Sequence, residues 1–176
     1  AALRGGARSL GVATLQEGIE LRQAGLTCPI LLLGNLNKIQ EFEACIQWEL
    51  MPTLSSLREA LLCEQIAKKC GLKISIHLKI DTGMTRLGCD LNEALALIQT
   101  ICGFENIILQ GVYSHLATAD DHLSNVTKEQ QQKFENLIKK LDQRKNNLCY
   151  HLANSAGTLI DHNLHYNMVR VGLALY

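Results

Sequence analysis

The sequence predicts an α/β protein, a truncated (β/α)8 barrel of the TIM type, on three observations. Short runs of consecutive apolar residues alternate with segments of helical periodicity along all 176 residues. The runs are apolar on both faces, which is typical of parallel strands covered by helices. Polar residues follow directly after four of the runs, as they do at the catalytic face of such barrels.

Seven apolar runs fit the strands of this barrel. They cover residues 10–13, 29–33, 49–54, 74–80, 107–113, 150–153 and 168–176. A complete barrel has eight strands and usually about 250 residues, so one strand is missing from the set. The chain starts within an apparent helix and ends on an apolar run with no turn after it. We therefore expect residues 1–176 to be part of a longer barrel.

Helical segments lie between the strand candidates, and three of them open with a capping-box pair. The pairs are Ser56 with Glu59, Asp90 with Glu93, and Thr127 with Gln130. Gly71 provides a stop for the first of these helices. Residues 133–144, in the third helix, carry mixed charges, which is typical of an exposed helix face.

The composition argues against several classes of partner. Seventeen basic and seventeen acidic side chains give no net charge, whereas nucleic acid and anionic membranes select a basic surface. No apolar run approaches the roughly 18 residues of a membrane span, and the N-terminus lacks the apolar core of a secretory signal.

The seven cysteines contain no Cys-x-x-Cys pair, so the sequence predicts neither a disulfide framework nor a structural zinc site. His162 and His165 lack a third ligand and are interpreted as loop residues, so no metal site is predicted. Free thiols indicate a reducing compartment, and we therefore expect a cytoplasmic protein.

The polar residues after the strand candidates would meet on one face of the barrel. Their segments are 79–88, 113–120, 151–157 and 169–176. Asn154 and Ser155 begin a stretch of small residues that could open a helix, and Arg170 and Gly172 lie in the last segment. Helix starts bind anions through backbone N–H groups, and barrels often bind phosphate with their final two loops. An ordinary helix cap at Asn154 is the alternative.

Four titratable residues in these segments have two readings each. Arg86 and Arg170 lie in or beside apolar strands, where a guanidinium is costly unless paired, so a structural ion pair is the alternative to ligand binding. Lys79 is either an exposed strand residue or a buried one that needs a negative partner near Arg86. His115, at the end of a strand candidate, is either a satisfied core residue or a functional one.

Taken together, the four segments resemble the barrel motifs of alanine racemase. The motifs are KIDTGMTRLG, YSHLATAD, HLANSAG and RVGLALY, in this order. The stretch LGVATLQEGIELRQAGLTCPILLLG is also similar to that family's second and third barrel segments. The resemblance covers essentially the whole chain. It implies that residues 1–176 hold about strands 2 to 8 of a pyridoxal-phosphate-binding barrel, without the first strand or the C-terminal β domain.

The resemblance implies pyridoxal 5'-phosphate as the cofactor. Arg170 would meet the pyridine nitrogen and keep it unprotonated, because an arginine does not readily give up its proton. Ser155, with backbone N–H groups near Gly172 and Leu173, would hold the phosphate, and Asn154 would support that loop.

The same resemblance implies three further roles. His115 would pack against Arg170 and orient it. Arg86 would lie near the phenolic oxygen of the cofactor and the substrate carboxylate, which suits its two-pronged guanidinium, and Met84 would line that pocket through its backbone. In this family the lysine that matches Lys79 can carry a carbamate, which would position Arg86.

The chain also departs from the family pattern. Val171 stands where the family often has proline, and Thr85 where it often has glycine, which would restrict the backbone if φ is positive there. The family's Schiff-base lysine lies on the first strand, in a segment like VKANAYGHG. Its second base is a tyrosine in the C-terminal domain, donated across a dimer interface. We therefore expect no catalytic base in residues 1–176 and no racemase activity from them alone.

For the full-length protein the resemblance implies an isomerase. It would be a homodimer that interconverts L- and D-alanine by two-base proton transfer through an aldimine with the coenzyme, and would supply D-alanine for peptidoglycan. A non-catalytic barrel for coenzyme homeostasis, a racemase of another small amino acid such as serine, and a truncated product without function are alternatives. An amino-acid decarboxylase fits less well, because that group commonly places an acidic residue where Arg170 stands.

Overall fold

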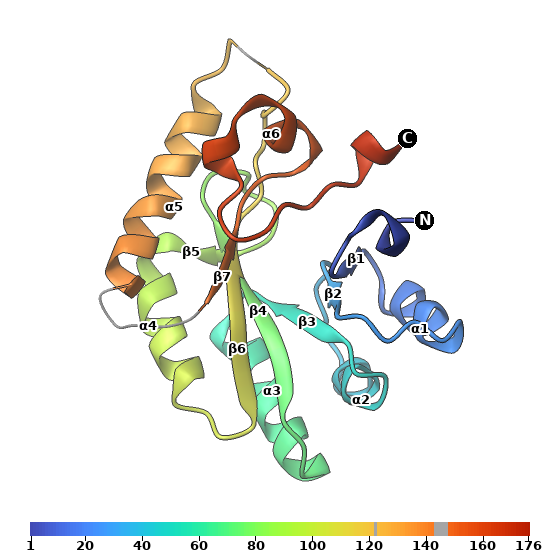
Figure 1. Ribbon diagram of the computed structural model, residues 1–176. Coiled ribbons are helices and arrows are strands. Elements are labelled where there is room, and N and C mark those ends of the chain that lie inside the picture. The colour runs from blue at the N-terminus through green and yellow to red at the C-terminus, as the bar shows by residue number, and fades with distance from the viewer. Residues whose placement is uncertain (122, 143–147) are drawn as a thin grey trace. The chain divides into compact units, whose positions relative to one another are not determined.

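The computed structural model (Figure 1) describes residues 1–121, 123–142 and 148–176. The chain divides into two compact units. The first unit comprises Ala1–His77 and Thr100–Leu109, and the second comprises Leu78–Gln99 and Gln110–Tyr176. Every predicted site residue lies in the second unit, so the first is described only briefly.

The first unit repeats one motif, a parallel strand followed by a helix. A short 3-10 helix, η1 (Leu3–Gly5), precedes it, and the motifs are β1 (Leu10–Val12) with α1 (Leu15–Gln23), β2 (Ile30–Leu32) with α2 (Ile39–Gln47), and β3 (Met51–Leu54) with α3 (Leu57–Cys70). β1 pairs with β2 and β2 with β3, both in parallel. β2 is buried at all three positions, as its two apolar faces require. The predicted parallel strand–helix alternation is confirmed here.

The predicted ends of α3 are confirmed. Ser56 caps the helix by accepting the N–H of Glu59 at 3.2 Å, whereas the Glu59 carboxylate accepts the N–H of Ser55, at 2.6 Å, rather than that of Ser56. Gly71 ends the helix with φ of 66°. This left-handed conformation is one that glycine adopts without strain.

The second unit contains the C-terminal halves of two longer strands, β4 (Ile74–Asp81) and β6 (Ile107–Tyr113). β7 (Cys149–His151) pairs in parallel with β6, and this register sets Tyr113 beside His151 at the strand ends. The two-residue strand β5 (Cys89–Asp90) pairs in parallel with β4. The helices are α4 (Leu91–Cys102), α5 (Val126–Asp142) and α6 (Ser155–Ile160), with short 3-10 helices η2 (His162–Leu164) and η3 (Leu173–Leu175).

The start of α4 is confirmed, whereas the predicted start of α5 is wrong. The Asp90 carboxylate accepts the N–H of Asn92 at 2.7 Å, directly at the first turn of α4. In α5 the Ser124 hydroxyl accepts the N–H of Val126 at 3.2 Å, so Thr127 lies inside the first turn. Gln130 therefore does not complete a capping box. It turns into the unit and is only 1% exposed.

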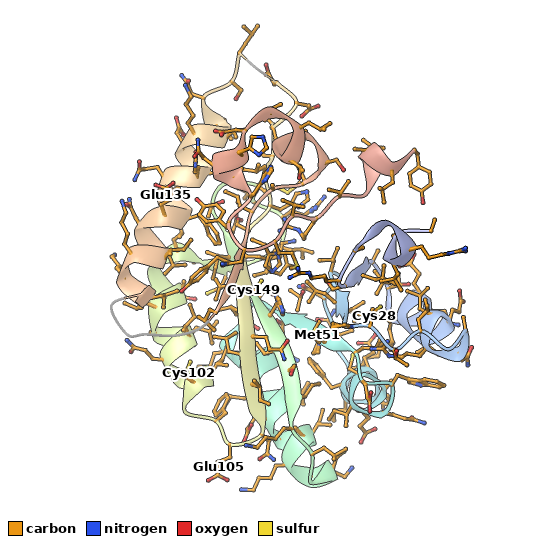
Figure 2. The ribbon with its side chains drawn as sticks, in the orientation of Figure 1. Cys28, Met51, Cys102, Glu105, Glu135 and Cys149 are labelled. Atoms are coloured by element: carbon orange, nitrogen blue, oxygen red, sulfur yellow. The ribbon has the colours of Figure 1, made fainter. Side chains whose placement is uncertain are left out.

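The mixed-charge face predicted for residues 133–144 is confirmed where the structure describes it. Lys133, Lys139 and Lys140 are exposed, while residues 143 and 144 lie outside the described part of the chain. Glu135, labelled in Figure 2, is half-buried and accepts the Tyr166 hydroxyl at 3.5 Å. The Tyr166 ring also packs edge-on against Phe134, with centroids 5.4 Å apart. These contacts anchor the segment before Arg170 to α5.

The strand predicted at 168–176 is wrong. The described segment contains no ladder there: Arg170 donates its N–H to the Ala153 carbonyl at 3.0 Å, and the chain then forms η3. Leu173 is 85% exposed, so apolarity in this segment does not reflect strand burial. Strand β5 was not predicted, because two residues are too few to show periodicity.

Candidate functional site

Arg170 lies at the centre of the polar residues at the strand ends of the second unit. Its Nη2 donates to the carbonyls of Ser114 at 2.6 Å and Leu152 at 3.1 Å. Nη1 lies 2.8 Å from Nδ1 of His151, and Nη2 lies 3.3 Å from Nδ1 of His115. All four partners are uncharged acceptors. Among the described residues no carboxylate pairs with Arg170, so the structural ion pair is not the arrangement found.

The two histidines must both be acceptors toward Arg170. A guanidinium carries only donors, so a hydrogen bond from Arg170 to either ring requires an unprotonated Nδ1. Nη2 has two hydrogens for three acceptors, of which Nδ1 of His115 is the most distant. Burial, together with the positive charges of Arg170, Lys79 and Arg86, lowers the pKa of His115 to about 4. The contact predicted between His115 and Arg170 is therefore present, with a neutral imidazole.

His151 was missed by reasoning from sequence. It opens the motif HLANSAG but sits within an apolar run, where a histidine gives no signal of its own. The structure buries it completely and stacks its ring on Tyr113, with centroids 4.6 Å apart and planes 8° from parallel. Pairing of β6 with β7 sets these two residues side by side. Strand register was the information that the sequence lacked.

Tyr113 is a buried platform that faces two cations. The Arg170 guanidinium carbon lies 4.9 Å from the ring centroid, and Nζ of Lys79 lies 5.7 Å from it. Cations over the face of an aromatic ring are attracted by its quadrupole. This arrangement partly compensates the burial that lowers the pKa of Arg170 to about 10.

Lys79 is buried, not an exposed strand residue, with only 5% of its surface accessible. Burial, with the positive charges of Arg86 and Arg170, lowers the pKa of its ammonium to about 8, while Asp81 acts in the opposite direction. The neutral amine is consequently far more populated than for an exposed lysine. The need for a negative partner, which burial was expected to create, is met only in part by Asp81.

The loop after β4 is folded tightly against the strand. The Asp81 carboxylate accepts the N–H groups of Gly83 at 2.8 Å and Thr85 at 3.1 Å. Thr85 has φ of 54°, so the positive φ that would restrict this residue is present. Gly88 has φ of 136°, and a Cβ there would lie 2.6 Å from the backbone nitrogen of Asp81. Only glycine fits at that position.

Arg86, in the same loop, lies beside β4 as predicted but is exposed, so its guanidinium does not carry the cost of burial. The sequence placed it close to β4, but the turn at residues 82–88 lifts it into solvent. Its charge nevertheless acts on Lys79 and His115. Met84 is half-buried in this loop. The roles of both residues toward substrate remain predictions.

Ser155 joins the start of α6 to the loop after Arg170. Its hydroxyl oxygen accepts the N–H groups of Gly172 at 3.0 Å and Ala174 at 3.2 Å. Asn154 caps α6 by accepting the N–H of Gly157 at 2.9 Å. The helix cap that was the alternative interpretation at Asn154 is therefore present. Leu173 lies between the two donors, and its role in phosphate binding stays a prediction.

The donor set fits a phosphorylated, anionic ligand. Hydroxyl and backbone N–H groups gather at the start of α6 and in residues 172–174, which suits a phosphate. Lys79, Arg86 and Arg170 add positive charge, and Arg170 has no acidic partner among the described residues. The arrangement can hold a phosphate, and it can place Arg170, whose charge no described carboxylate neutralises, against a second polar atom of the same ligand.

Other features of the chain do not supply a second centre. Among residues 1–121, 123–142 and 148–176 no three His, Cys, Asp or Glu side chains gather closely enough to hold a metal ion. His162 and His165 pack edge to face, and His165 bonds the Thr158 carbonyl at 2.9 Å. All seven cysteines are free, and burial raises the pKa of Cys45 and Cys63 to about 12. Within the described segments every helix is too short or too polar to cross a membrane.

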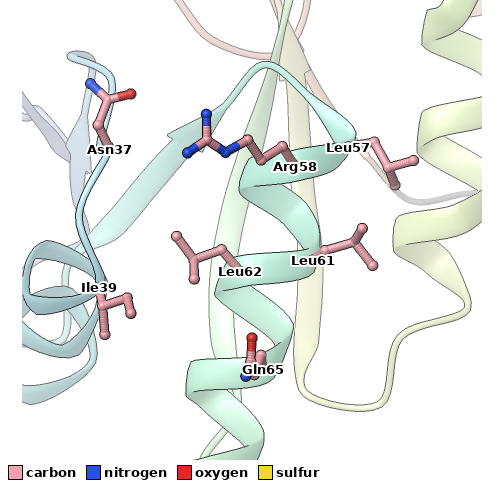
Figure 3. Close-up of a pocket in the computed structure, with 7 residues that line it drawn as sticks. All are labelled: Asn37, Ile39, Leu57, Arg58, Leu61, Leu62 and Gln65. Carbon is pink, nitrogen blue, oxygen red and sulfur yellow. The ribbon is translucent and has the colours of Figure 1, made fainter.

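A groove of about 660 Å³ lies in the first unit (Figure 3). It is lined by Asn37, Ile39, Leu57, Arg58, Leu61, Leu62 and Gln65. None of the residues predicted for the site lines it. It is an apolar surface groove between α2 and α3 with one cation, and it has no polar cluster suited to chemistry.

The chain has parallel strands with helices between them, and its cations gather where the strands end. These features define it as a β/α-barrel protein with a cationic site. The chain belongs to the alanine racemase N-terminal domain family: the family profile described as "Alanine racemase, N-terminal domain" matches residues 1–176. The resemblance drawn from its motifs is therefore confirmed.

Individual relatives agree in sequence and in fold. The chain is 57% identical over 180 residues to an alanine racemase of Prochlorococcus marinus, with all of this chain and 47% of the relative covered. An alanine racemase structure from Clostridium difficile superposes with a TM-score of 0.91 at 39% identity, over 99% of this chain and 46% of that one. The Bacillus anthracis alanine racemase with bound L-Ala-P gives 0.89 at 30% identity, over 99% and 45%.

These superpositions confirm the predicted β/α-barrel fold class. The chain spans about half the length of the curated relatives it matches. What the whole protein does is therefore a matter of proposal.

Proposed function

We propose that the full-length protein carrying this segment is a pyridoxal-phosphate-dependent isomerase that interconverts L- and D-alanine. The observation that carries the proposal is the Arg170 cluster: a guanidinium held by four neutral acceptors beside a Ser155–Gly172 cradle suited to phosphate. Family membership and the names of the matched relatives support alanine as the substrate.

The residues present fit this coenzyme. Ser155 and the N–H groups of residues 172–174 would bind its phosphate, with Asn154 holding the turn and His115 fixing Arg170. Arg170 would face its pyridine nitrogen. When bound, the coenzyme supplies an electron-withdrawing ring that acidifies the α-proton of an attached amino acid.

Arg170 decides which chemistry that ring favours. Because the guanidinium retains its proton even with its pKa lowered to about 10, the facing nitrogen stays an acceptor and receives no proton. The ring is then a weaker electron sink, which disfavours decarboxylation and transamination and leaves return of the proton to the same carbon.

Arg86 would bind the substrate carboxylate, with Met84 lining the same pocket, and Lys79 would position Arg86. A neutral Lys79 amine can react with carbon dioxide to give a carbamate and release one proton. That change turns a buried cation into an anion and would pair it with Arg86. The pKa of about 8 for Lys79 keeps the reactive neutral form accessible near neutral pH.

The remaining parts of the proposal reach beyond residues 1–176. These residues would form about strands 2 to 8 of the barrel. The two bases would come from a lysine on a first strand and a tyrosine of a partner subunit in a homodimer. A cytoplasmic location and supply of D-alanine for peptidoglycan complete the proposal. The non-catalytic alternative is not favoured, because the matched relatives are named alanine racemase.

The test is a paired measurement on the full-length protein. Titration of the apoprotein with pyridoxal 5'-phosphate, followed by its absorbance, should show saturable binding, and chiral analysis should show formation of D-alanine from L-alanine and the reverse. Serine serves as the comparison substrate. Absence of coenzyme binding, or binding without racemisation of alanine, would contradict the proposal.

A further inference from the structure

Gln130 is a buried polar side chain that none of the roles above uses. It projects from α5 and is 1% exposed. Its Oε1 accepts the N–H of Ala117 at 2.9 Å, and its Nε2 donates to the carbonyl of His115 at 2.8 Å and to Oγ1 of Thr82 at 3.1 Å. A backbone N–H can only donate and a carbonyl can only accept, so these partners fix the orientation of the amide.

The three bonds bracket the residue that touches Arg170. Gln130 holds the backbone at His115 and again two residues later, at Ala117. Through Thr82 it also reaches Ser114, because the two hydroxyls lie 2.7 Å apart. Ser114 and His115 are two of the four acceptors of the Arg170 guanidinium. The Gln130 amide therefore holds the segment that provides two of the four acceptors of Arg170.

Apart from the bonds to Arg170 and Thr82, the described contacts of this segment are longer than those of Gln130. Residues 114–116 belong to no helix or strand. The Arg170 guanidinium, the group that the turn would orient, donates to the Ser114 carbonyl at 2.6 Å. The N–H of Ser114 reaches the His151 carbonyl at 3.3 Å, and the Leu116 carbonyl accepts from Asn154 at 3.4 Å. Since hydrogen bonds weaken with length, Gln130 constrains the turn more than either of these last two bonds does.

We infer that Gln130 is a positioning residue for the site: its amide, with Thr82, holds the 114–117 turn so that His115 and Ser114 orient Arg170. The inference rests on the proposed function for its link to the coenzyme, and on geometry alone for its effect on His115. Gln130, Thr82 and Ser114 are each 1% exposed, so this hydrogen-bonded chain lies in the interior of the unit, where such bonds are stronger than in water.

The experiment uses the full-length protein with Gln130→Met, which keeps the length of the side chain and removes all three bonds. Gln132→Met is the matched control, since Gln132 is an exposed glutamine on the same helix. Two quantities are measured. One is the titration midpoint of the His115 ring by NMR in the apoprotein, assigned with His115→Gln. The other is the dissociation constant of pyridoxal 5'-phosphate.

In Gln130→Met the His115 midpoint should rise from about 4 toward 6.5, because the ring moves away from Arg170 and toward water. The dissociation constant of the coenzyme should rise about tenfold, the factor that corresponds to losing the net free energy of one hydrogen bond. Gln132→Met should leave both at their wild-type values. A general loss of stability would not shift the midpoint of a single histidine in protein that remains folded.

Each outcome decides a separate question. Wild-type values of both quantities in folded Gln130→Met would overturn the inference. If the wild-type protein itself fails to bind the coenzyme, the proposed function fails, and the His115 midpoint still tests Gln130. Should Gln130→Met not fold, Thr82→Val removes the hydroxyl that links Gln130 to Ser114 and leaves the two backbone bonds of Gln130 in place. It should raise the dissociation constant about threefold, and an unchanged value would overturn the inference.

Discussion

The neutral His115 ring makes a specific prediction about how stability depends on pH. The imidazole has a pKa of about 4 in the folded protein and 6.5 when unperturbed. Between these values the unfolded chain binds a proton that the folded chain does not. The free energy of unfolding contributed by this ring is therefore complete above pH 6.5 and is lost as the pH falls toward 4.

The size of the effect follows from the same two values. Each pH unit across that window is equivalent to about 1.4 kcal/mol for one proton. The wild-type protein should thus lose about 2 to 3 kcal/mol between pH 7 and pH 4 through His115, with the lower figure allowing for partial access of water to the ring. Arg170, Lys79 and Arg86 are cations that repel a protonated His115 ring, so none of them stabilises its protonated form.

The perturbation is His115→Gln, which removes the titrating group and keeps an oxygen acceptor for Arg170. Urea unfolding of both full-length proteins at pH 7, 5.5 and 4 measures the free energy, and other titrations cancel in the comparison. The variant should be less sensitive to acid by the amount given above. If the free energy of unfolding fell equally with pH in the two proteins, the assignment of a neutral, desolvated imidazole at Arg170 would be refuted.

Four further changes test other parts of the site. Arg170→Lys should lower the free energy of unfolding by about 2 to 4 kcal/mol, because one ammonium cannot reach all four acceptors around the planar guanidinium. Urea unfolding measures this loss, and a smaller loss would mean that the four hydrogen bonds contribute little to stability. Ser155→Ala should raise the dissociation constant of the coenzyme about tenfold, measured by absorbance, and an unchanged value would remove Ser155 from the phosphate cradle. Protein equilibrated with 13C-labelled bicarbonate should show a carbamate carbon signal by NMR that Lys79→Met abolishes; persistence of the signal would assign it elsewhere. Gly88→Ala should destabilise by about 3 kcal/mol or more through strain and overlap, whereas Gly5→Ala, with no atom within 4 Å of its Cβ, should not.

Much of the fold could be predicted from local patterns. Parallel strands buried on both faces leave continuous apolar runs, and six of the seven predicted runs overlap strands of the structure. The run at 168–176 failed because its apolar side chains are exposed, so apolarity without burial misled the prediction. Gln130 looked like the second half of a capping box, and only the position of Ser124 shows that the helix starts one residue earlier than Thr127.

The site was predictable where a residue carries unusual chemistry for its surroundings. Arg170 was recognisable as a costly charge in an apolar run, and His115 as a polar residue at a strand end. For Lys79 the sequence left an exposed strand position as an alternative, and the structure shows a buried one. His151 and Tyr113 were not recognisable, because their importance comes from lateral pairing of β6 with β7, a contact between residues 38 positions apart along the chain. Arg86 shows the opposite error, since adjacency to a strand did not imply burial.

Arg170 reaches carbonyl groups on two separate loops, those that follow β6 and β7, and this has a consequence for how the protein can vary. Ser114 and Leu152 are the first residues after their strands, so an insertion or deletion between a strand and its acceptor would move that carbonyl by the length of a residue. That length, about 3.3 Å or more, exceeds the tolerance of a hydrogen bond. The point at which each strand ends is thus fixed as long as the arginine is present, whereas changes in length further along either loop leave both carbonyls in place.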